Sequence, residues 1–534
     1  MKRLKILKYD CIRIVNIYIS YIILILFIYG TLWTVFQAQM YPGKNLFSFF
    51  ILFLACYFSG HLVNSIGLPP LLGMLIAGIL LRNIAAINIA KDINLRWSIV
   101  IKSLSLVIIL IHGGLKCDSA VLLRFKCLVT LLSCVPCIGE AIAIAIVTRY
   151  VLAFPWAWSF VMGFVMSPLS PAVIVPQLVK IQELGYGIDK GIPTLILAAS
   201  SIDGTIAIMG FAIFAQLAQP TPEHKESLTF TVLHGPLEVL IGLLYGFGVG
   251  VLFWYIPSYE LSEPFKSRFR YSLLASAGVF AVFGGKLATF SGAGAFGTLT
   301  LTLVANYGWF KRGNKYDNVV SRDFKFIWDF FQPLLFGLIG TQMDIYSIQL
   351  KFLGYCILLI VVGLIARASL AILSVTNIGF TWKEKLFVGI TWTPKATVQA
   401  AIGSLALDTA ILRQSPETTM NLARMVLIAS IIVILVTAPL GAIAIDKAGP
   451  RLLTRSPTLP RQKMEEAIFD DSIPIKDLNR KTDFPIGPTN RQGITNQNFR
   501  DDIHAKSGKI FPADIPSEPD GDEHSGVKEL VTKL

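Results

Sequence analysis

The chain has 534 residues, of which 54% are hydrophobic and 15% are charged, with a formal net charge of +13 and a mean hydropathy of +0.63. Soluble domains carry about 25% charged residues, so this composition excludes a soluble globular protein. Nucleic-acid binding is not indicated either, because membrane proteins gather Lys and Arg in cytoplasmic loops and no segment interleaves basic and aromatic residues as an RNA-binding sheet does.

Apolar runs long enough to cross a bilayer recur along the chain. A membrane helix needs about 20 mostly apolar residues. On that criterion the sequence predicts an all-α, polytopic membrane protein with about fourteen transmembrane helices. In chain order we expect them at residues 14–33, 47–63, 69–81, 98–111, 127–150, 156–178, 193–218, 232–256, 271–290, 296–309, 326–342, 352–373, 385–405 and 425–445.

The distribution of basic residues predicts the topology. If the basic N-terminus is cytoplasmic, most basic loops fall on the same side, so the positive-inside rule favours two cytoplasmic termini. We expect residues 1–45 to form the N-terminal cytoplasmic end and first transmembrane helix, and residues 46–449 the main transmembrane domain. Residues 450–534 are polar and proline-rich, which predicts a disordered cytoplasmic tail. Plasma and intracellular membranes, mitochondrial ones included, remain open as locations.

Four ionisable residues lie deep in apolar runs: Glu140, Asp203, Arg367 and Lys395. Such residues are costly in a membrane, so each is a functional hypothesis. A structural ion pair is favoured for Glu140 and Arg367. An ion pathway is favoured for Asp203 and Lys395, because both lie beside predicted helix breaks or small polar residues.

The sequence predicts a helix break in each of two membrane segments. Ser167, Pro168 and Pro171 interrupt one segment, and Pro394 interrupts another. Proline removes a backbone donor and clashes with the preceding turn. A pair of broken segments is the strongest sequence indication of a transporter site near the bilayer midplane. No nucleophile with a base and no His/Asp metal cluster appears, so we expect neither an enzyme nor a bound cofactor.

Several long strings of residues resemble the animal NHA-type sodium/proton antiporters of the cation/proton antiporter superfamily. They are SPAVIVP at 170–176, GYGIDKGIPT at 185–194, WDFFQPLLFGLIG at 328–340, PKATVQAAIG at 394–403 and TAPLG at 437–441, and the similarity spans about residues 47–453. The resemblance implies inverted repeats with core and dimer domains and two crossing broken helices. It also implies elevator-like exchange of Na⁺ or Li⁺ for H⁺ by a homodimer in lipid.

Carried over position by position, the resemblance pairs Glu140 with Arg367 and makes Asp203 the first aspartate of the family's double-aspartate site. The chain departs from the pattern at Gly204, where the family has the second aspartate, usually the principal cation contact. A second departure lies near Gln342, where the pattern has an acid.

The resulting hypothesis is that Asp203 alternates between a proton and Na⁺ or Li⁺, or between a proton and a salt bridge to Lys395 or Arg367. Backbone carbonyls and three hydroxyls, those of Ser170, Ser201 and Thr205, would complete a shell of hard oxygen ligands. The alternative is a non-transporting homologue with a regulatory or scaffolding role, because Gly204 brings neither charge nor side-chain oxygen.

Overall fold

The computed structural model describes residues 2–116, 126–219, 228–258, 260–288, 290–312 and 318–455. All of them belong to the compact unit Met1–Lys463. Within these ranges the backbone is mainly helical, and an isolated bridge between Tyr186 and Arg455 is the only β interaction. The last helix, expected at residues 425–445, runs from Glu417 to Leu452. The predicted disordered tail, residues 450–534, therefore begins too early, because its first residues to Leu452 are helical; residues 456–534 lie outside the described residues.

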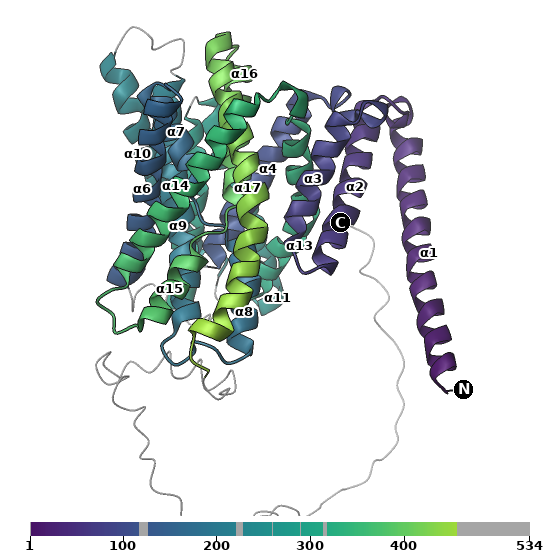
Figure 1. Ribbon diagram of the computed structural model, residues 1–534. Helices are drawn as coiled ribbons and strands as arrows, with labels where there is room; N and C mark the ends of the chain where they lie inside the picture. The colour runs from purple at the N-terminus through teal and green to yellow at the C-terminus, as the bar shows by residue number, and fades with distance from the viewer. Residues whose placement is uncertain are drawn as a thin grey trace, which may run out of the picture. The chain divides into compact units, whose positions relative to one another are not determined.

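Figure 1 shows the described helices in chain order by colour. They are α1 (Lys2–Phe36), α2 (Asn45–Ser65), α3 (Pro70–Asn83), α4 (Leu95–Leu115), α6 (Lys126–Val151), α7 (Trp156–Met166), α8 (Pro171–Glu183), α9 (Ile192–Ala218), α10 (Leu228–Tyr255), α11 (Glu263–Leu287), α12 (Ser291–Lys311), α13 (Asn318–Thr341), α14 (Leu350–Ser374), α15 (Trp382–Thr391), α16 (Thr397–Leu412) and α17 (Glu417–Leu452). Short 3₁₀ turns occupy Gln37–Met40, Ala85–Ile87, Ile89–Lys91 and Ile345–Ser347.

The predicted all-α polytopic membrane fold is confirmed by the helical backbone and its apolar spans. A helix suits a membrane because it satisfies its own backbone hydrogen bonds in lipid. Among the described residues, nine helical spans are long and apolar enough to cross a membrane. The predicted number of fourteen is therefore not confirmed. Two further helices, α3 and α16, are apolar but shorter. In α11 the charged residues Glu263, Lys266 and Lys286 lower the apolar character of a helix of sufficient length.

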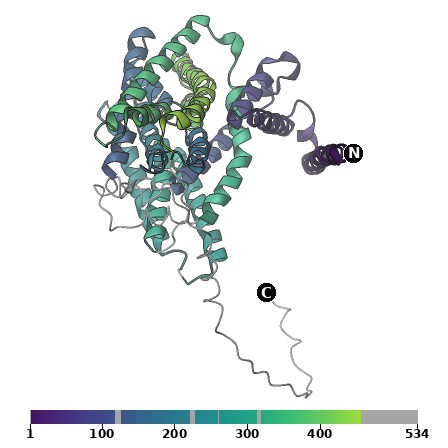
Figure 2. The ribbon, with the colours of Figure 1, turned by 60° about the horizontal axis from the view of Figure 1, so that its bottom comes forward.

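The helices pack in two groups around a shared boundary. We call α6, α7, α8, α9, α14, α15, α16 and α17 the site group, and α2, α3, α4, α10, α11, α12 and α13 the frame group. Figure 1 shows α6, α7 and α14 on one side of α17, and α2, α3 and α13 on the other. In Figure 2, α1 is seen nearly along its axis beside the helices of the frame group. The arrangement into core and dimer domains that the resemblance implies stays a prediction.

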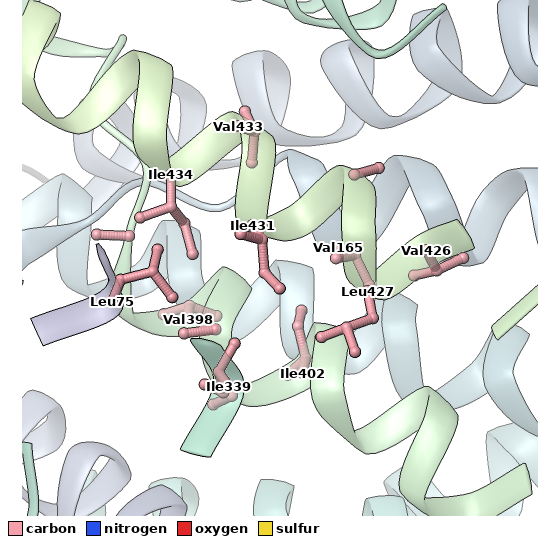
Figure 3. Packing of buried hydrophobic residues seen from close by; sticks show 14 of the residues in the cluster. Leu75, Val165, Ile339, Val398, Ile402, Val426, Leu427, Ile431, Val433 and Ile434 are labelled. Atoms are coloured by element: carbon pink, nitrogen blue, oxygen red, sulfur yellow. The ribbon is translucent and has the colours of Figure 1, made fainter. Parts of the chain in front are cut away.

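The boundary between the two groups is apolar where α3 and α13 meet α16. Leu75 and Ile339 of the frame group lie against Val398 and Ile402 of the site group (Figure 3). All four side chains are buried. Protein interiors are packed as densely as organic crystals, so the two groups fit closely in this region.

Candidate ion-binding site

Two helices of the site group are interrupted, and the interruptions meet. The first lies between the end of α7 at Met166 and the start of α8 at Pro171, and the second between α15 and α16. The backbone nitrogen of Ser170 donates to the carbonyl of Pro394 over 3.0 Å. The predicted pair of broken helices is therefore confirmed, and the two breaks are joined directly.

Proline chemistry accounts for the position of the breaks. Pro171 is the first residue of α8, where the missing N–H is one that the helix leaves unpaired in any case. Pro394 stands in the second break and likewise has no N–H. The side-chain amide of Gln399 ties the two breaks together, since its oxygen accepts from the nitrogen of Ala396 over 2.8 Å and its nitrogen donates to the carbonyl of Pro168.

The four ionisable residues gather at this meeting point. One carboxylate oxygen of Asp203, on α9, is 2.6 Å from Nη2 of Arg367, on α14. Nη1 of the same guanidinium is 2.8 Å from Glu140, on α6, and also donates to the carbonyl of Ser167. The ammonium of Lys395 lies 2.5 Å from Glu140 and 2.8 Å from the carbonyl of Ser167.

This cluster carries two acids and two bases, and its formal charge is zero. None of the four residues is more than 2% exposed. A buried charge is tolerated when it is paired with good geometry, and the planar guanidinium of Arg367 serves two carboxylates at once. The structure places Arg367, rather than Lys395, on Asp203. Lys395 contacts Glu140 instead.

Asp203 is also held by the first break itself. Its second carboxylate oxygen accepts the backbone N–H of Leu169 over 2.7 Å. Leu169 lies in the non-helical segment after α7, where backbone groups are free of helical partners. The Asp203 carboxylate therefore bridges the first break and Arg367, and a movement of either would alter one of its two contacts.

The three predicted hydroxyl ligands lie nearby but bond elsewhere. Ser201 donates to the carbonyl of Leu197 and Thr205 to that of Ser201, both within α9. The hydroxyl of Ser170 accepts from the nitrogen of Thr397 over 3.4 Å. A role for these oxygens as cation ligands remains a prediction. Within the described ranges, no group of three or more His, Cys, Asp and Glu side chains is arranged to hold a metal ion.

Gly204 follows Asp203 on α9 and leaves room for a side chain. A Cβ placed there would meet only Val398, at 3.7 Å, which is ordinary van der Waals contact. Val398 is the second residue of α16, so the open position faces the start of the second broken helix. Steric crowding at Cβ therefore does not explain why glycine stands at position 204, where the family pattern has its second aspartate.

Buried charged residues outside the cluster, among them Lys102, Asp408 and Glu238, were not singled out from the sequence. Lys102 of α4 and Asp408 of α16 form a salt bridge, and Glu238 of α10 is hydrogen-bonded to Gln216 of α9 over 3.0 Å. Lys102 and Glu238 carry the same signal as the other four, a charge inside an apolar run. Asp408 fell beyond the predicted end of its span at residue 405, whereas α16 continues to Leu412.

Two broken helices that meet at a buried, charge-balanced cluster are the architecture of a broken-helix membrane transporter. The chain belongs to the sodium/hydrogen exchanger family: the family model described as "Sodium/hydrogen exchanger, transmembrane" matches residues 17–445.

Named relatives agree with this assignment. The chain is 39% identical to human sodium/hydrogen exchanger 9B2 over 462 residues, which cover 85% of this chain and 82% of the relative. It is 35% identical to human sodium/hydrogen exchanger 9B1 over 449 residues, covering 83% and 85%. Among solved structures, it resembles the sodium proton antiporter MjNhaP1 from Methanocaldococcus jannaschii with a TM-score of 0.59 and 14% identity, over 76% of this chain and 97% of that chain. This last likeness concerns the fold.

Proposed function

We propose that the chain exchanges a monovalent cation, Na⁺ or Li⁺, for H⁺ across a membrane, with Asp203 as the carboxylate that binds both. The observation that carries the proposal is the position of Asp203, buried where the two breaks meet, with one oxygen on Leu169 and the other on Arg367. Family membership supports the same chemistry.

Exchange follows from competition for one negative charge. In the geometry described here the guanidinium of Arg367 balances Asp203. A proton or a cation that replaces this contact must supply the same single positive charge. The carbonyl oxygen of Ser167 has no helical partner and accepts from Arg367 and Lys395 in this geometry. Oxygens of this kind are hard ligands for Na⁺ in broken-helix transporters, and this one can serve a cation once those side chains withdraw. Because proton and cation cannot occupy Asp203 together, each must leave before the other binds.

Access to alternate sides requires the site to move relative to the membrane. We infer an elevator-like displacement of the site group against the frame group, in a homodimer surrounded by lipid. The positive-inside pattern supports two cytoplasmic termini. The membrane concerned is the plasma membrane or an intracellular one.

The test is a flux assay on the full chain reconstituted in liposomes with a pH-sensitive dye. An imposed Na⁺ or Li⁺ gradient should drive proton movement in the parent protein. Asp203→Ala and the isosteric Asp203→Asn should both reduce the signal to that of empty liposomes. Asp446→Ala, which removes a carboxylate half-exposed on α17, is the matched control and should leave flux unchanged. A signal undiminished in Asp203→Ala would contradict the assignment.

A second candidate function is favoured by one observation, the glycine at position 204. Without the second carboxylate the chain could keep its fold and act as a transport-deficient regulatory or scaffolding homologue. Gly204→Asp distinguishes the two, since its Cβ fits beside Val398. If the parent is inactive and Gly204→Asp alone creates exchange, while Gly204→Asn does not, the natural protein is the transport-deficient form.

A further inference from the structure

A second buried ion pair lies outside the cluster at the breaks. The ammonium nitrogen of Lys102, on α4, is 2.6 Å from each carboxylate oxygen of Asp408, on α16. Both side chains are 4% exposed. Both charges are therefore removed from water, and each depends on the other for its stabilisation.

This pair connects the two helix groups. Lys102 belongs to the frame group, and Asp408 lies on the broken helix α16 of the site group, eleven positions after Thr397. The contacts among Asp203, Arg367, Glu140 and Lys395 all stay within the site group. Lys102 and Asp408 thus bring charge to a boundary that is apolar where α3 and α13 meet α16 (Figure 3).

Further polar side chains of the frame group surround the pair. The amide nitrogen of Gln342, which follows α13, donates to Asp408 over 3.3 Å. Lys286, at the end of α11, donates to the hydroxyl of Ser103, the neighbour of Lys102. Asp408 is therefore met by two side chains of the frame group, those of Lys102 and Gln342, and a displacement of α16 would disturb both contacts.

A cavity lies near the pair on the same boundary, lined by chain neighbours of Lys102 and Asp408 rather than by the two residues themselves. Its wall includes Leu106, one turn after Lys102 on α4, and Thr409, the neighbour of Asp408 on α16. Ile208 and Ala215 of α9 also line it. α9 also carries Asp203, so the cavity lies along the helix that holds the candidate ion site.

We propose that Lys102 and Asp408 form a lock between the two helix groups that closes the cavity beside them and must open when the site group moves. The lock rests on the proposed function in one respect, that transport displaces one group against the other. A sliding step would pull the two charges apart inside an apolar boundary. Separation takes from each buried charge the partner that stabilises it, so we expect separation of the pair, entry of water and opening of the cavity to be coupled.

The test measures access to the cavity without measuring transport. Ala215→Cys introduces a small thiol into the cavity wall of the full chain in proteoliposomes. A membrane-impermeant maleimide is added, and mass spectrometry follows modification of the peptide containing position 215, so native cysteines do not interfere. The double variant Lys102→Met/Asp408→Leu removes both charges at similar side-chain size and leaves neither unpaired. Asp408→Asn is a second, isosteric variant.

We expect Lys102→Met/Asp408→Leu and Asp408→Asn to speed modification by roughly fivefold or more, in the range of conformational coupling between sites. The matched control is Lys180→Met/Asp446→Leu. It removes a 2.5 Å ion pair between α8 and α17 that lies wholly within the site group. Modification in this control should proceed at the parental rate. The charge-reversed variant Lys102→Asp/Asp408→Lys restores an ion pair and should return modification toward that rate.

Equal modification rates in the parent and in both variants that lack the pair would overturn the lock. So would an equal acceleration in the control variant. The flux assay is read separately. A parent that exchanges no ions but shows the expected labelling differences removes the proposed function and leaves the lock standing. A parent that exchanges ions but shows no labelling differences removes the lock and leaves the proposed function standing.

Discussion

Arg367 forms buried salt bridges to two carboxylates, those of Asp203 and Glu140. Its replacement by leucine leaves two buried carboxylates with Lys395 as the nearest cation. Removal of one partner from a buried ion pair costs about 3–5 kcal/mol. We therefore expect Arg367→Leu to lower the stability of the detergent-solubilised protein by that order. Thermal denaturation followed by size-exclusion chromatography measures the change.

Two further variants separate the effect of burial from that of charge. Arg367→Lys keeps the charge but lacks the planar fork that reaches both carboxylates, so it should fall between the parent and Arg367→Leu. Lys180→Met breaks an exposed ion pair with Asp446, and such pairs are worth about 0–1 kcal/mol. Equal stability losses in Arg367→Leu and Lys180→Met would show that the buried cluster does not stabilise the fold.

The identity of the charged residues was predictable from the sequence, and the resemblance paired Glu140 with Arg367, but the partner of Asp203 was left open. Glu140, Asp203, Arg367 and Lys395 each interrupt an apolar run, which is a local property of the chain. Whether Asp203 meets Arg367 or Lys395 depends on how α9 packs against α14 and the second break. Asp203 and Arg367 are more than 150 residues apart in the chain. Lys102 carried the same local signal, but its partner on α16 lay outside the predicted span.

Among structural elements, the joined breaks depend on Gln399. Its buried amide bonds the nitrogen of Ala396 and the carbonyl of Pro168. Gln399→Leu leaves both backbone groups unpaired, and each unpaired buried group costs about 1–3 kcal/mol. We expect a clear loss of thermal stability. Ser404→Ala on the same helix is the control, because the buried Ser404 hydroxyl bonds only to Ala401 of its own helix among the contacts described. A loss of thermal stability in Ser404→Ala as large as that in Gln399→Leu would contradict the proposed role of Gln399 in joining the two breaks.

Proline alone does not explain why only some segments break. Pro136, Pro236, Pro333 and Pro439 lie inside α6, α10, α13 and α17, and these helices continue through them. The first break contains Pro168 and Pro171 close together with serines, and the second is held open by contacts to the first. The sequence thus predicted where the breaks lie. The hydrogen bonds that keep them non-helical join residues more than 200 positions apart, as in Ser170 and Pro394, and required the structure.

On the scale of the whole molecule, the division into a site group and a frame group was implied by the resemblance and not by any local pattern. α9 and α16 belong to one group although α10–α13 stand between them in the chain. Apolar periodicity shows that a helix is buried, but not against which neighbour. The number of spans was hard to predict for a related reason: polar groups in α11 are tolerated because other helices cover them, and Lys266 and Arg270 are buried.

Charge balance in the whole molecule leads to a prediction about membrane potential. If Asp203 exchanges one cation for one proton, the moving site group carries the same charge in both directions. Each net charge moved across a membrane is worth about 2.3 kcal/mol per 100 mV, so a one-for-one exchanger should respond little to a potassium diffusion potential set with valinomycin. Gly204→Asp adds a second carboxylate that can take up another proton. Because the exchange would then move net charge, the flux of this variant should become sensitive to the membrane potential. Gly204→Asn has similar size without the charge and should behave as the parent. A parental flux that rises or falls strongly with potential would show that charges beyond Asp203 move with the site.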